Sequence, residues 1–319
     1  TRRSTAASVI AGSGKTRVLL WRTVNLIVNH GVKIEEIYLG TFTEKAALQL
    51  KDGLTSLLGL ATNETGHPYD LSRMYIGTVH ALCQQLISDR RFAIDRSRSK
   101  SPVLLDALDQ YFHLRAPRFW REASEKLKLP EDIISQVNAY FEKRNITKIE
   151  IFKSQHLAAE NCIALFNRFS EEHLTPDTIH KAARKDEDLK RLAQLYGFYL
   201  ESLKSGNQRR VDFSLLQQAA FEQLLKHPES GKVFRHVIVD EDQDTNSMQE
   251  KSFFRLAAGA KNICVVGYDD QALYRFRGAT VENFVEFPER CQTYLKLKPK
   301  RIQLSINYRS RTKIVDFYN

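Results

Sequence analysis

The chain has few cysteines, and their spacing excludes the metal sites that cysteine pairs build. There are four in 319 residues, at positions 83, 162, 264 and 291, and no two have the C-x-x-C spacing of zinc or iron–sulfur sites. Cys264 lies in an apolar run and is expected to be a small core residue. This cysteine usage fits a reducing compartment, so we expect a cytoplasmic protein.

Long hydrophobic runs are also missing. No apolar stretch reaches the roughly 18 residues that a membrane-spanning helix needs, so no membrane partner is expected. The chain opens on polar and basic residues and enters a motif almost at once, which predicts that no signal peptide is present. Hydrophobic residues make up 42% and charged residues 27%, as in ordinary folded proteins.

Acidic residues are outnumbered by basic ones. The sequence holds 48 Lys and Arg against 38 Asp and Glu, a formal charge of +10, and its pI is near 9.3. Such a surplus favours a polyanionic partner such as nucleic acid, although many basic proteins bind none.

Strand-like and helix-like segments alternate over the first ninety residues. The predicted strands are 6–11, 37–42 and 74–79, and the helices between them are 15–29 and 44–58, the latter ended by Gly59. This order argues for a parallel sheet with helices on its faces. From 101 to 205 helical spacing dominates, which indicates a helical insert. Strand signals return at 233–240, 262–267 and 301–306.

A glycine-rich segment joins the first predicted strand to the first predicted helix. It reads Val9, Ile10, Ala11, Gly12, Ser13, Gly14, Lys15 and Thr16. Glycines let backbone N–H groups close around phosphates, and the helix N-terminus adds a favourable dipole. Lys15 would reach the β- and γ-phosphates and the Thr16 hydroxyl would bind Mg²⁺, so ATP and Mg²⁺ are the expected cofactors. The alternative, a turn that merely starts a helix, is disfavoured by the strand–loop–helix order.

Val9 stands where the full phosphate-loop pattern has a small residue. A β-branched residue disfavours positive φ, so the strand is expected to run straight into the loop here.

An apolar run at 236–239 ends in two carboxylates, Asp240 and Glu241. A strand end delivers both to the carboxyl edge of the sheet, where ligands bind in such folds. Asp240 would hold Mg²⁺, and Glu241 would orient or deprotonate the attacking water. The alternative is an acidic cap for the helix expected near Asn246, although Asp244 could fill that position alone.

With these motifs placed, the chain resembles the UvrD/Rep family of superfamily 1 helicases. The matching segments are 41–47 (TFTEKAA), 77–83 (GTVHALC), 239–246 (VDEDQDTN), 265–279 (VVGYDDQALYRFRGA) and 304–310 (LSINYRS). Five segments in the family's order and at family-like spacing are specific, whereas the helical insert matches in position and character only. Asp242 and Tyr268 depart from the family's usual residues.

The resemblance assigns further nucleotide contacts. Gln271 would sense the γ-phosphate, and Tyr308 would stack on the adenine. Arg309 would act as an arginine finger from a second RecA-like domain across a cleft, a role that can be worth roughly 10³–10⁵ in rate. The alternative for Arg309 is a surface ion pair.

The resemblance also implies contacts with single-stranded DNA. Phe42, Tyr274 and Phe276 would offer ring faces to bases, while Thr78 and His80 would contact the strand or its backbone. Each has an alternative: the three aromatic residues could pack in a core or against a neighbouring domain, and a lone histidine often caps a helix. The basic stretch 90–100 could track the DNA backbone or could be a solvated surface.

The implied fold is α/β: a RecA-like P-loop domain with a parallel sheet, interrupted by an all-helical insert. We expect this domain to span 1–90 and 211–290, the insert to span 91–210, and 291–319 to begin a second RecA-like domain. The family's adenine-reading glutamine segment and its last two motifs lie beyond this sequence. A piece of a larger protein, or a truncated product that hydrolyses ATP poorly, is therefore expected.

The implied function is an ATP-dependent DNA helicase, as in DNA repair, that moves 3′ to 5′ on single strands and opens single/double-strand junctions. Three alternatives stay open: a helicase subunit of a helicase–nuclease, a translocase that strips proteins from DNA, and a catalytically silent DNA-binding module.

Overall fold

The structure, a computed structural model, describes residues 5–9, 13–92, 102–142, 154–205, 208–227, 229–267, 281–304 and 306–311. The chain divides into two compact units. Unit 1 comprises 1–99 and 220–319, and unit 2 comprises 100–219. The insert boundaries expected from the sequence, 91 and 210, each lie nine residues before the structural ones, 100 and 219.

Unit 1 is built on a six-stranded sheet in the order β3-β2-β6-β7-β1-β8, with parallel pairing throughout. Its strands are β1 (Thr5–Val9), β2 (Ile37–Thr41), β3 (Tyr75–Thr78), β6 (His236–Asp240), β7 (Ile263–Gly267) and β8 (Lys300–Leu304). Connections that cross from strand to parallel strand bring the functional segments to one carboxyl edge. The predicted α/β fold with a parallel sheet is therefore confirmed.

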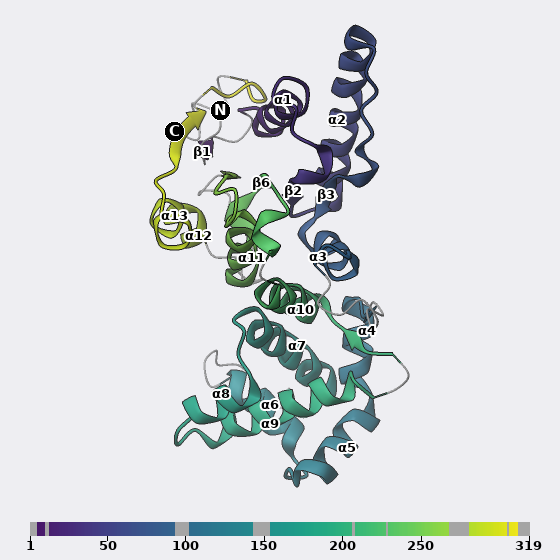
Figure 1. Cartoon of the computed structure of the whole chain (residues 1–319). Coiled ribbons are helices and arrows are strands. Elements are labelled where there is room, and N and C mark those ends of the chain that lie inside the picture. Colours follow the sequence, from purple (N-terminus) through teal and green to yellow (C-terminus); the bar gives the residue numbers. More distant parts are fainter. Residues whose placement is uncertain are drawn as a thin grey trace. The chain divides into compact units, whose positions relative to one another are not determined.

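Helices α1 (Lys15–Val28) and α2 (Glu44–Thr65) cover one face of the sheet, above the strands in Figure 1. Leu19 of α1 and Leu50 of α2 are fully buried against apolar side chains of the strands. On β2, Leu39 points to this face and Tyr38 to the other, as the period of two along a strand requires. Burial on both faces explains why β2, β6 and β7 are almost entirely apolar.

The opposite face is covered by α3 (Val79–Ser88) and α11 (Ser247–Ala257). An aromatic cluster fills this layer: Tyr38, Tyr75, Phe92, Phe234 and Phe253. The remaining helical elements of this unit are η1 (Ile34–Glu36), η2 (Leu71–Arg73), η4 (Ser230–Lys232), η5 (Asp242–Asp244), α12 (Val281–Val285) and α13 (Phe287–Leu295).

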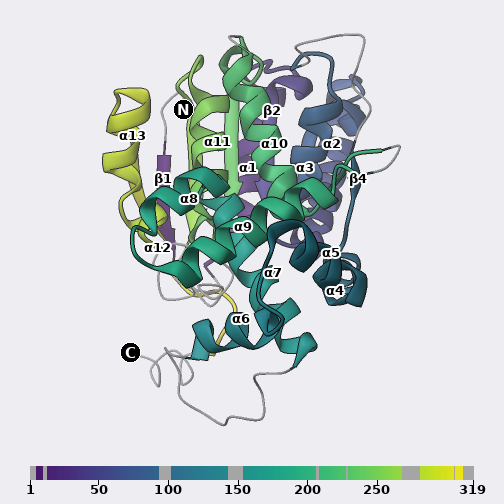
Figure 2. The same cartoon turned by 90° about the horizontal axis from the view of Figure 1, so that it is seen from below.

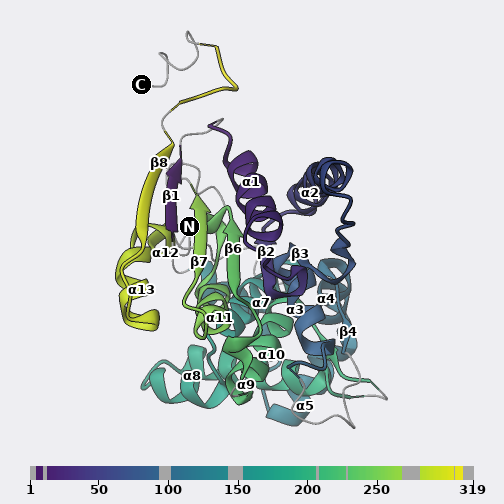
Figure 3. The same cartoon turned by 45° about the horizontal axis from the view of Figure 1, so that its top comes forward.

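Strand β8 occupies the edge of this same sheet, where Val9 pairs with Leu304 in register. Figure 3 shows β1 and β8 side by side. From the sequence we expected this strand to belong to a second RecA-like domain. For the described residues that expectation was wrong, because β8 is part of the unit 1 sheet. The backbone of β1 offers β8 a partner inside unit 1, which the apolar pattern of the strand could not reveal.

Helix α2 also differs from its expected bounds, because it runs past Gly59 and ends before Gly66. Gly66 has φ 70° and closes the helix in the left-handed region, where glycine carries no Cβ penalty. Gly59 shows no positive φ and stays within the helix.

The described residues of unit 2 form helices, together with one pair of two-residue strands. Its helices are α4 (Ala107–Arg115), α5 (Pro117–Leu127), α6 (Ile133–Glu142), α7 (Gln155–Glu171), α8 (Pro176–Ala182) and α9 (Glu187–Ser202), and α10 (Phe213–Lys226) leads back to unit 1. Figure 2 shows α6, α7 and α9 packed together. Strands β4 (Val103–Leu104) and β5 (Arg210–Val211) pair where the chain enters and leaves the unit, so the expected all-helical insert carries a short parallel ribbon.

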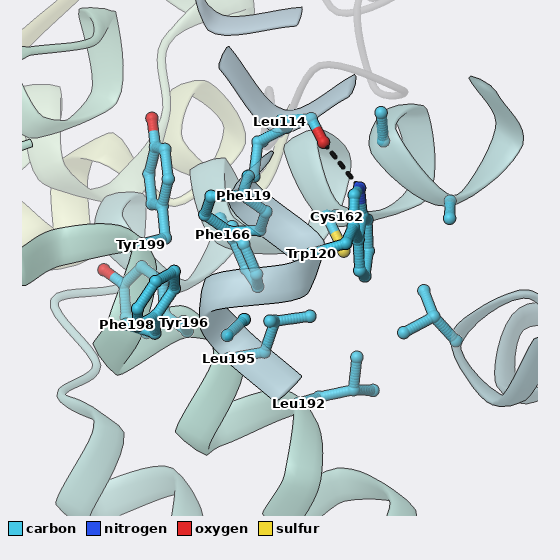
Figure 4. Packing of buried hydrophobic residues seen from close by; sticks show 14 of the residues in the cluster. Leu114, Phe119, Trp120, Cys162, Phe166, Leu192, Leu195, Tyr196, Phe198 and Tyr199 are labelled. Atoms are coloured by element: carbon cyan, nitrogen blue, oxygen red, sulfur yellow. Dashed lines mark hydrogen bonds between the residues drawn. The ribbon is translucent and has the colours of Figure 1, made fainter. Parts of the chain in front are cut away.

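Aromatic side chains dominate the core of unit 2 (Figure 4). Phe166 is fully buried and packs on both Tyr196 and Tyr199, with ring centroids 5.3 Å apart in each pair. Trp120 donates its indole N–H to the carbonyl oxygen of Leu114 at 2.7 Å, which satisfies the polar edge of a buried ring.

Among the described residues, no helix is both long and apolar enough to cross a membrane. All four cysteines are buried and free, as expected for Cys264.

Candidate functional site

The phosphate loop lies at the carboxyl end of β1. The strand ends at Val9, and α1 begins at Lys15 with Gly14 as its N-cap. Gly14 has φ 86°, a left-handed conformation that favours glycine, and no side chain caps the helix. The first N–H groups of α1 are thus left for a ligand, and an anion suits them best. Ile10, Ala11 and Gly12 lie outside the described residues.

Ser13 is buried, and its hydroxyl has no hydrogen-bond partner among the described residues. Thr16 follows in the first turn of α1 and is partly buried. Both hydroxyl groups sit within three residues of Lys15, at the end of the helix where a phosphate would lie.

Lys15 is bonded to the second acidic motif, 226 residues away in sequence. Its Nζ atom lies 2.7 Å from Oε2 of Glu241, and the two side chains are 11% and 31% exposed. The same Glu241 oxygen accepts a hydrogen bond from Nε2 of Gln243 at 2.9 Å. The two predicted motifs therefore form one site.

Backbone geometry aims Glu241 at this lysine. Strand β6 ends at Asp240, and Glu241 then takes φ 53° and ψ 48°, a left-handed conformation that ends the strand abruptly. Helix α11 is capped by Asn246, whose Oδ1 accepts from the backbone N–H of Gln249 at 2.9 Å. Neither carboxylate of the pair is used as a helix cap, which removes the structural alternative for them.

Negative charge is in excess around Lys15. Burial, and then the neighbouring Glu241, raise the pKa of Asp240 to about 7, while Lys15 opposes the shift. Burial and Glu241 likewise raise the pKa of Asp244 to about 6, and its Oδ1 has no hydrogen-bond partner among the described residues. One ammonium group faces three carboxyl groups, so a bound cation would lower the free energy of the ionised state.

The described residues contain no cluster of three or more His, Cys, Asp or Glu side chains placed to hold a metal ion. Mg²⁺ needs no such cluster, because it takes one or two protein ligands and completes its shell with phosphate oxygens and water. The Thr16 hydroxyl and the Asp240 carboxylate fit that requirement.

A second buried charge cluster lies just behind the acidic motif, and the sequence did not reveal it. Asp242 is 1% exposed, and burial followed by the nearby Glu250 raises its pKa to about 8. Arg290 of α13 bonds Glu250 at 2.7 Å. The sequence showed Asp242 as a departure from the family, and the structure buries it in η5 beside Glu250 of α11 and Arg290 of α13.

A pocket of about 830 Å³ opens beside the phosphate loop. It is lined by Ser13, Gly14, Arg17, Val18, Trp21, Gln303, Leu304, Ile306 and Tyr308. Tyr308, predicted to stack on adenine, is 75% exposed at this pocket. Sequence reasoning missed Arg17 and Trp21, although a spacing of four residues on one helix places these two on the same side of it.

Arg309 is exposed, and its backbone N–H donates to Oδ1 of Asn307 at 2.9 Å. It follows β8 of the unit 1 sheet, so its expected origin in a second domain is not supported. Gln271 lies outside the described residues.

The predicted DNA contacts follow β2 and β3 at the same edge of the sheet. Phe42 comes directly after β2 and is partly buried. Thr78 caps α3, where its Oγ1 accepts from the N–H of Ala81 at 3.2 Å. Burial lowers the pKa of His80 to about 4, so this side chain is neutral at pH 7. Tyr274 and Phe276 lie outside the described residues.

Part of the basic stretch at 90–100 is bound within unit 1. Arg91 pairs with Asp89 at 2.9 Å, donates to the carbonyl of Glu35, and lies over the rings of Tyr75 and Phe234. This arginine therefore contacts the aromatic layer while its side chain stays 37% exposed, and 93–100 lie outside the described residues.

Comparison with known proteins adds independent findings. Residues 5–292 match the family model described as UvrD/REP helicase N-terminal domain. The chain is 28% identical to DNA helicase II of Haemophilus influenzae, over 97% of this chain and 37% of that protein. It is 28% identical to ATP-dependent DNA helicase UvrD1 of Mycobacterium leprae (97% and 36%) and to ATP-dependent DNA helicase SRS2 of Saccharomyces cerevisiae (96% and 24%). The chain thus spans less than two fifths of the length of these relatives.

Proposed function

The chain belongs to the UvrD/REP helicase N-terminal domain family, and from that premise we propose that it is the Mg-ATP-binding part of a DNA motor. The motor would move 3′ to 5′ along single-stranded DNA and open single/double-strand junctions, as a repair helicase does. The relatives are named as DNA helicases, which supports DNA as the substrate. The buried free thiols are in keeping with a cytoplasmic location.

The bond between Lys15 and Glu241 is the observation that carries the proposal. It joins the residue expected to hold the β- and γ-phosphates to the residue expected to handle the attacking water. When ATP binds, Lys15 turns to the phosphates, and the Glu241 carboxylate is released to accept a proton from water. Gln243, bonded to Glu241, keeps that carboxylate at the end of β6.

Mg²⁺, held by Thr16 and Asp240, would neutralise charge on the β- and γ-phosphates. Ionised Asp240 is favoured once this cation is present, because the burial and repulsion that raise its pKa are then offset. Gln271 and Arg309 would contact the γ-phosphate. Since Arg309 follows β8, we propose that it acts from the same domain as Lys15 and that the second motor domain begins after it.

Single-stranded DNA would cross the edge of the sheet beyond β2 and β3. Phe42, Tyr274 and Phe276 would stack on bases, each contact worth roughly 1–3 kcal/mol. Thr78 uses its hydroxyl as a helix cap, and neutral His80 would act as a hydrogen-bonding group rather than as a cation. Unit 2 is the insert of this motor domain.

The test is ATP hydrolysis by this chain with and without single-stranded DNA, beside Lys15→Ala as the blank. Hydrolysis that DNA stimulates and the variant loses supports a working motor core. Binding of ATP and DNA without hydrolysis would show that the second motor domain is needed for turnover. A folded chain that binds neither ligand would overturn the proposal.

A further inference from the structure

The pocket beside the phosphate loop gathers exposed apolar side chains. Trp21 is 52% exposed, Ile306 60% and Tyr308 75%, and all three line it together with Val18. Exposed apolar groups scattered singly need no explanation, but a concave group of them marks a binding site. Because Ser13 and Gly14 line the same pocket, its occupant is continuous with whatever binds the phosphate loop.

Helix α1 divides its residues between the core and this pocket. Leu19 and Val24 are buried in the core between α1 and the sheet, whereas Arg17, Val18 and Trp21 line the pocket. Arg17 and Trp21 are four residues apart and therefore lie on one side of the helix, one turn from each other. Trp21 lies about 9 Å along the helix axis from Lys15, at 1.5 Å per residue, so the pocket extends from the phosphate loop well along α1.

On the basis of the proposed function, we propose that Trp21 is a wall of the nucleobase subsite, where its indole contacts the base beside Tyr308. The core does not require a tryptophan on this side of the helix, since half of its surface faces solvent. A base has an apolar face that matches an indole ring, and such contacts tolerate any base. The polar lining groups are few, the Arg17 guanidinium and the Gln303 amide among them, so ring area should matter more than base-edge hydrogen bonds.

If Trp21 contacts the base, its removal should change the affinities for ATP and for tripolyphosphate differently. ATP carries a base, whereas inorganic tripolyphosphate reaches only the phosphate loop. Trp21→Ala should weaken ATP binding about tenfold and leave tripolyphosphate binding unchanged, while Trp21→Phe should keep most of the ATP affinity. Leu60→Ala, which truncates a 63% exposed side chain on α2 outside this pocket, is the matched control and should change neither affinity.

Fluorescence gives a second readout. The chain has two tryptophans, and the other, Trp120, is buried in unit 2. ATP should change the emission of the wild-type chain, tripolyphosphate should change it much less, and the ATP response should vanish in Trp21→Phe.

Equal loss of ATP and tripolyphosphate binding in Trp21→Ala would overturn the inference, because the tryptophan would then support the loop and not the base. Unchanged ATP binding in that variant would overturn it as well. A folded wild-type chain that binds ATP no better than Lys15→Ala does, and that binds no single-stranded DNA, would refute the proposed function itself. The two failures are therefore distinguishable.

Discussion

The carboxyl edge of the sheet in unit 1 and the core of unit 2 treat buried polar groups in opposite ways. In unit 2, Gln110 donates to Asn167, Tyr199 and Asp212, and Tyr199 donates to Asp212 at 2.6 Å. At the sheet edge, Ser13, Thr41 and Asp244 keep buried oxygen atoms without a hydrogen-bond partner among the described residues.

A buried polar group without a partner costs about 1–3 kcal/mol, so it persists where something else supplies the missing partner. Paired polar groups, by contrast, stabilise one arrangement of a core. We infer that the polar groups in the core of unit 2 stabilise its fold, whereas those at the edge of unit 1 are placed to bind a ligand. Other buried side-chain atoms of unit 1 without a hydrogen-bond partner among the described residues include Oε2 of Glu36 and Nε of Arg22, and the structure gives no account of them.

The largest effect should come from the shared bond of the site. Glu241→Gln should lower ATP turnover by roughly 10²–10⁴-fold, because an amide cannot accept the proton of the attacking water. ATP binding should persist or tighten, since Lys15 no longer pairs with a carboxylate. Steady-state hydrolysis and equilibrium ATP binding measure the two separately.

The control for that change is Glu64→Gln, an exposed glutamate on α2, which should leave both quantities as they are. Undiminished turnover in Glu241→Gln would show that Glu241 does not accept the proton of the attacking water. The edge of unit 1 would then no longer differ from the core of unit 2 by serving a ligand.

A change in unit 2 should affect stability and spare the site. Phe166→Ala removes a fully buried ring and should lower the free energy of unfolding of this unit by about 3–5 kcal/mol. Phe112→Ala truncates a 59% exposed ring of α4 in the same unit and should cost less than about 0.5 kcal/mol. Urea unfolding followed by Trp120 emission reports the effect. Parallel loss of ATP binding wherever unit 2 unfolds would show that the two units are one cooperative body.

Local patterns in the sequence predicted each strand of the six-stranded sheet and both the acidic and the glycine-rich motif, because strand burial and loop chemistry depend on neighbouring residues. Residues 236–241 show this well: three consecutive apolar residues followed by two carboxylates suffice to place the acids at the end of a buried strand. The same pattern says nothing about which strand lies alongside. Strand β8 was therefore assigned to the wrong domain, since its pairing with β1 joins residues almost three hundred positions apart.

Three further misses depend on the three-dimensional structure in the same way. Gly59 was expected to end α2, but a glycine ends a helix through its φ value, which sequence alone does not give. The raised pKa of Asp242 comes from its burial and from Glu250, with Arg290 opposing it, and both of these residues lie on other helices. Trp21 became a candidate only when β8 brought Gln303 and Tyr308 to the same pocket.

Phe42 tests whether the edge of unit 1 also serves DNA. Phe42→Ala should weaken binding to single-stranded DNA by roughly 1–3 kcal/mol, about 5- to 150-fold in affinity, without changing ATP affinity. Leu48→Ala, at a 61% exposed position on the adjoining helix, should leave DNA binding unchanged. If DNA affinity stays the same while the unfolding free energy falls, Phe42 belongs to the core, and the contrast between edge and core does not extend to this residue.

The smallest effect concerns Glu171, a carboxyl group of unit 2 that is less well stabilised by hydrogen bonds than the other buried polar groups there. Burial raises the pKa of Glu171 from its ordinary 4.5 to about 7, although Ser214 donates a hydrogen bond to it at 3.0 Å. Between these two values the folded state binds more protons than the unfolded state, so the free energy of unfolding falls as pH rises from about 4.5 to about 7.

Glu171→Gln removes the titration and keeps an acceptor for Ser214. The variant should therefore exceed wild type in stability at pH 8 by about 1–2 kcal/mol, after allowance for partial exposure, and the gain should shrink toward pH 5. Urea unfolding at the two pH values measures this, with the more exposed neighbour Glu172→Gln as control. A gain of the same size at both pH values would mean that Glu171 is ionised in the fold at acid pH, as a fully satisfied buried carboxylate would be.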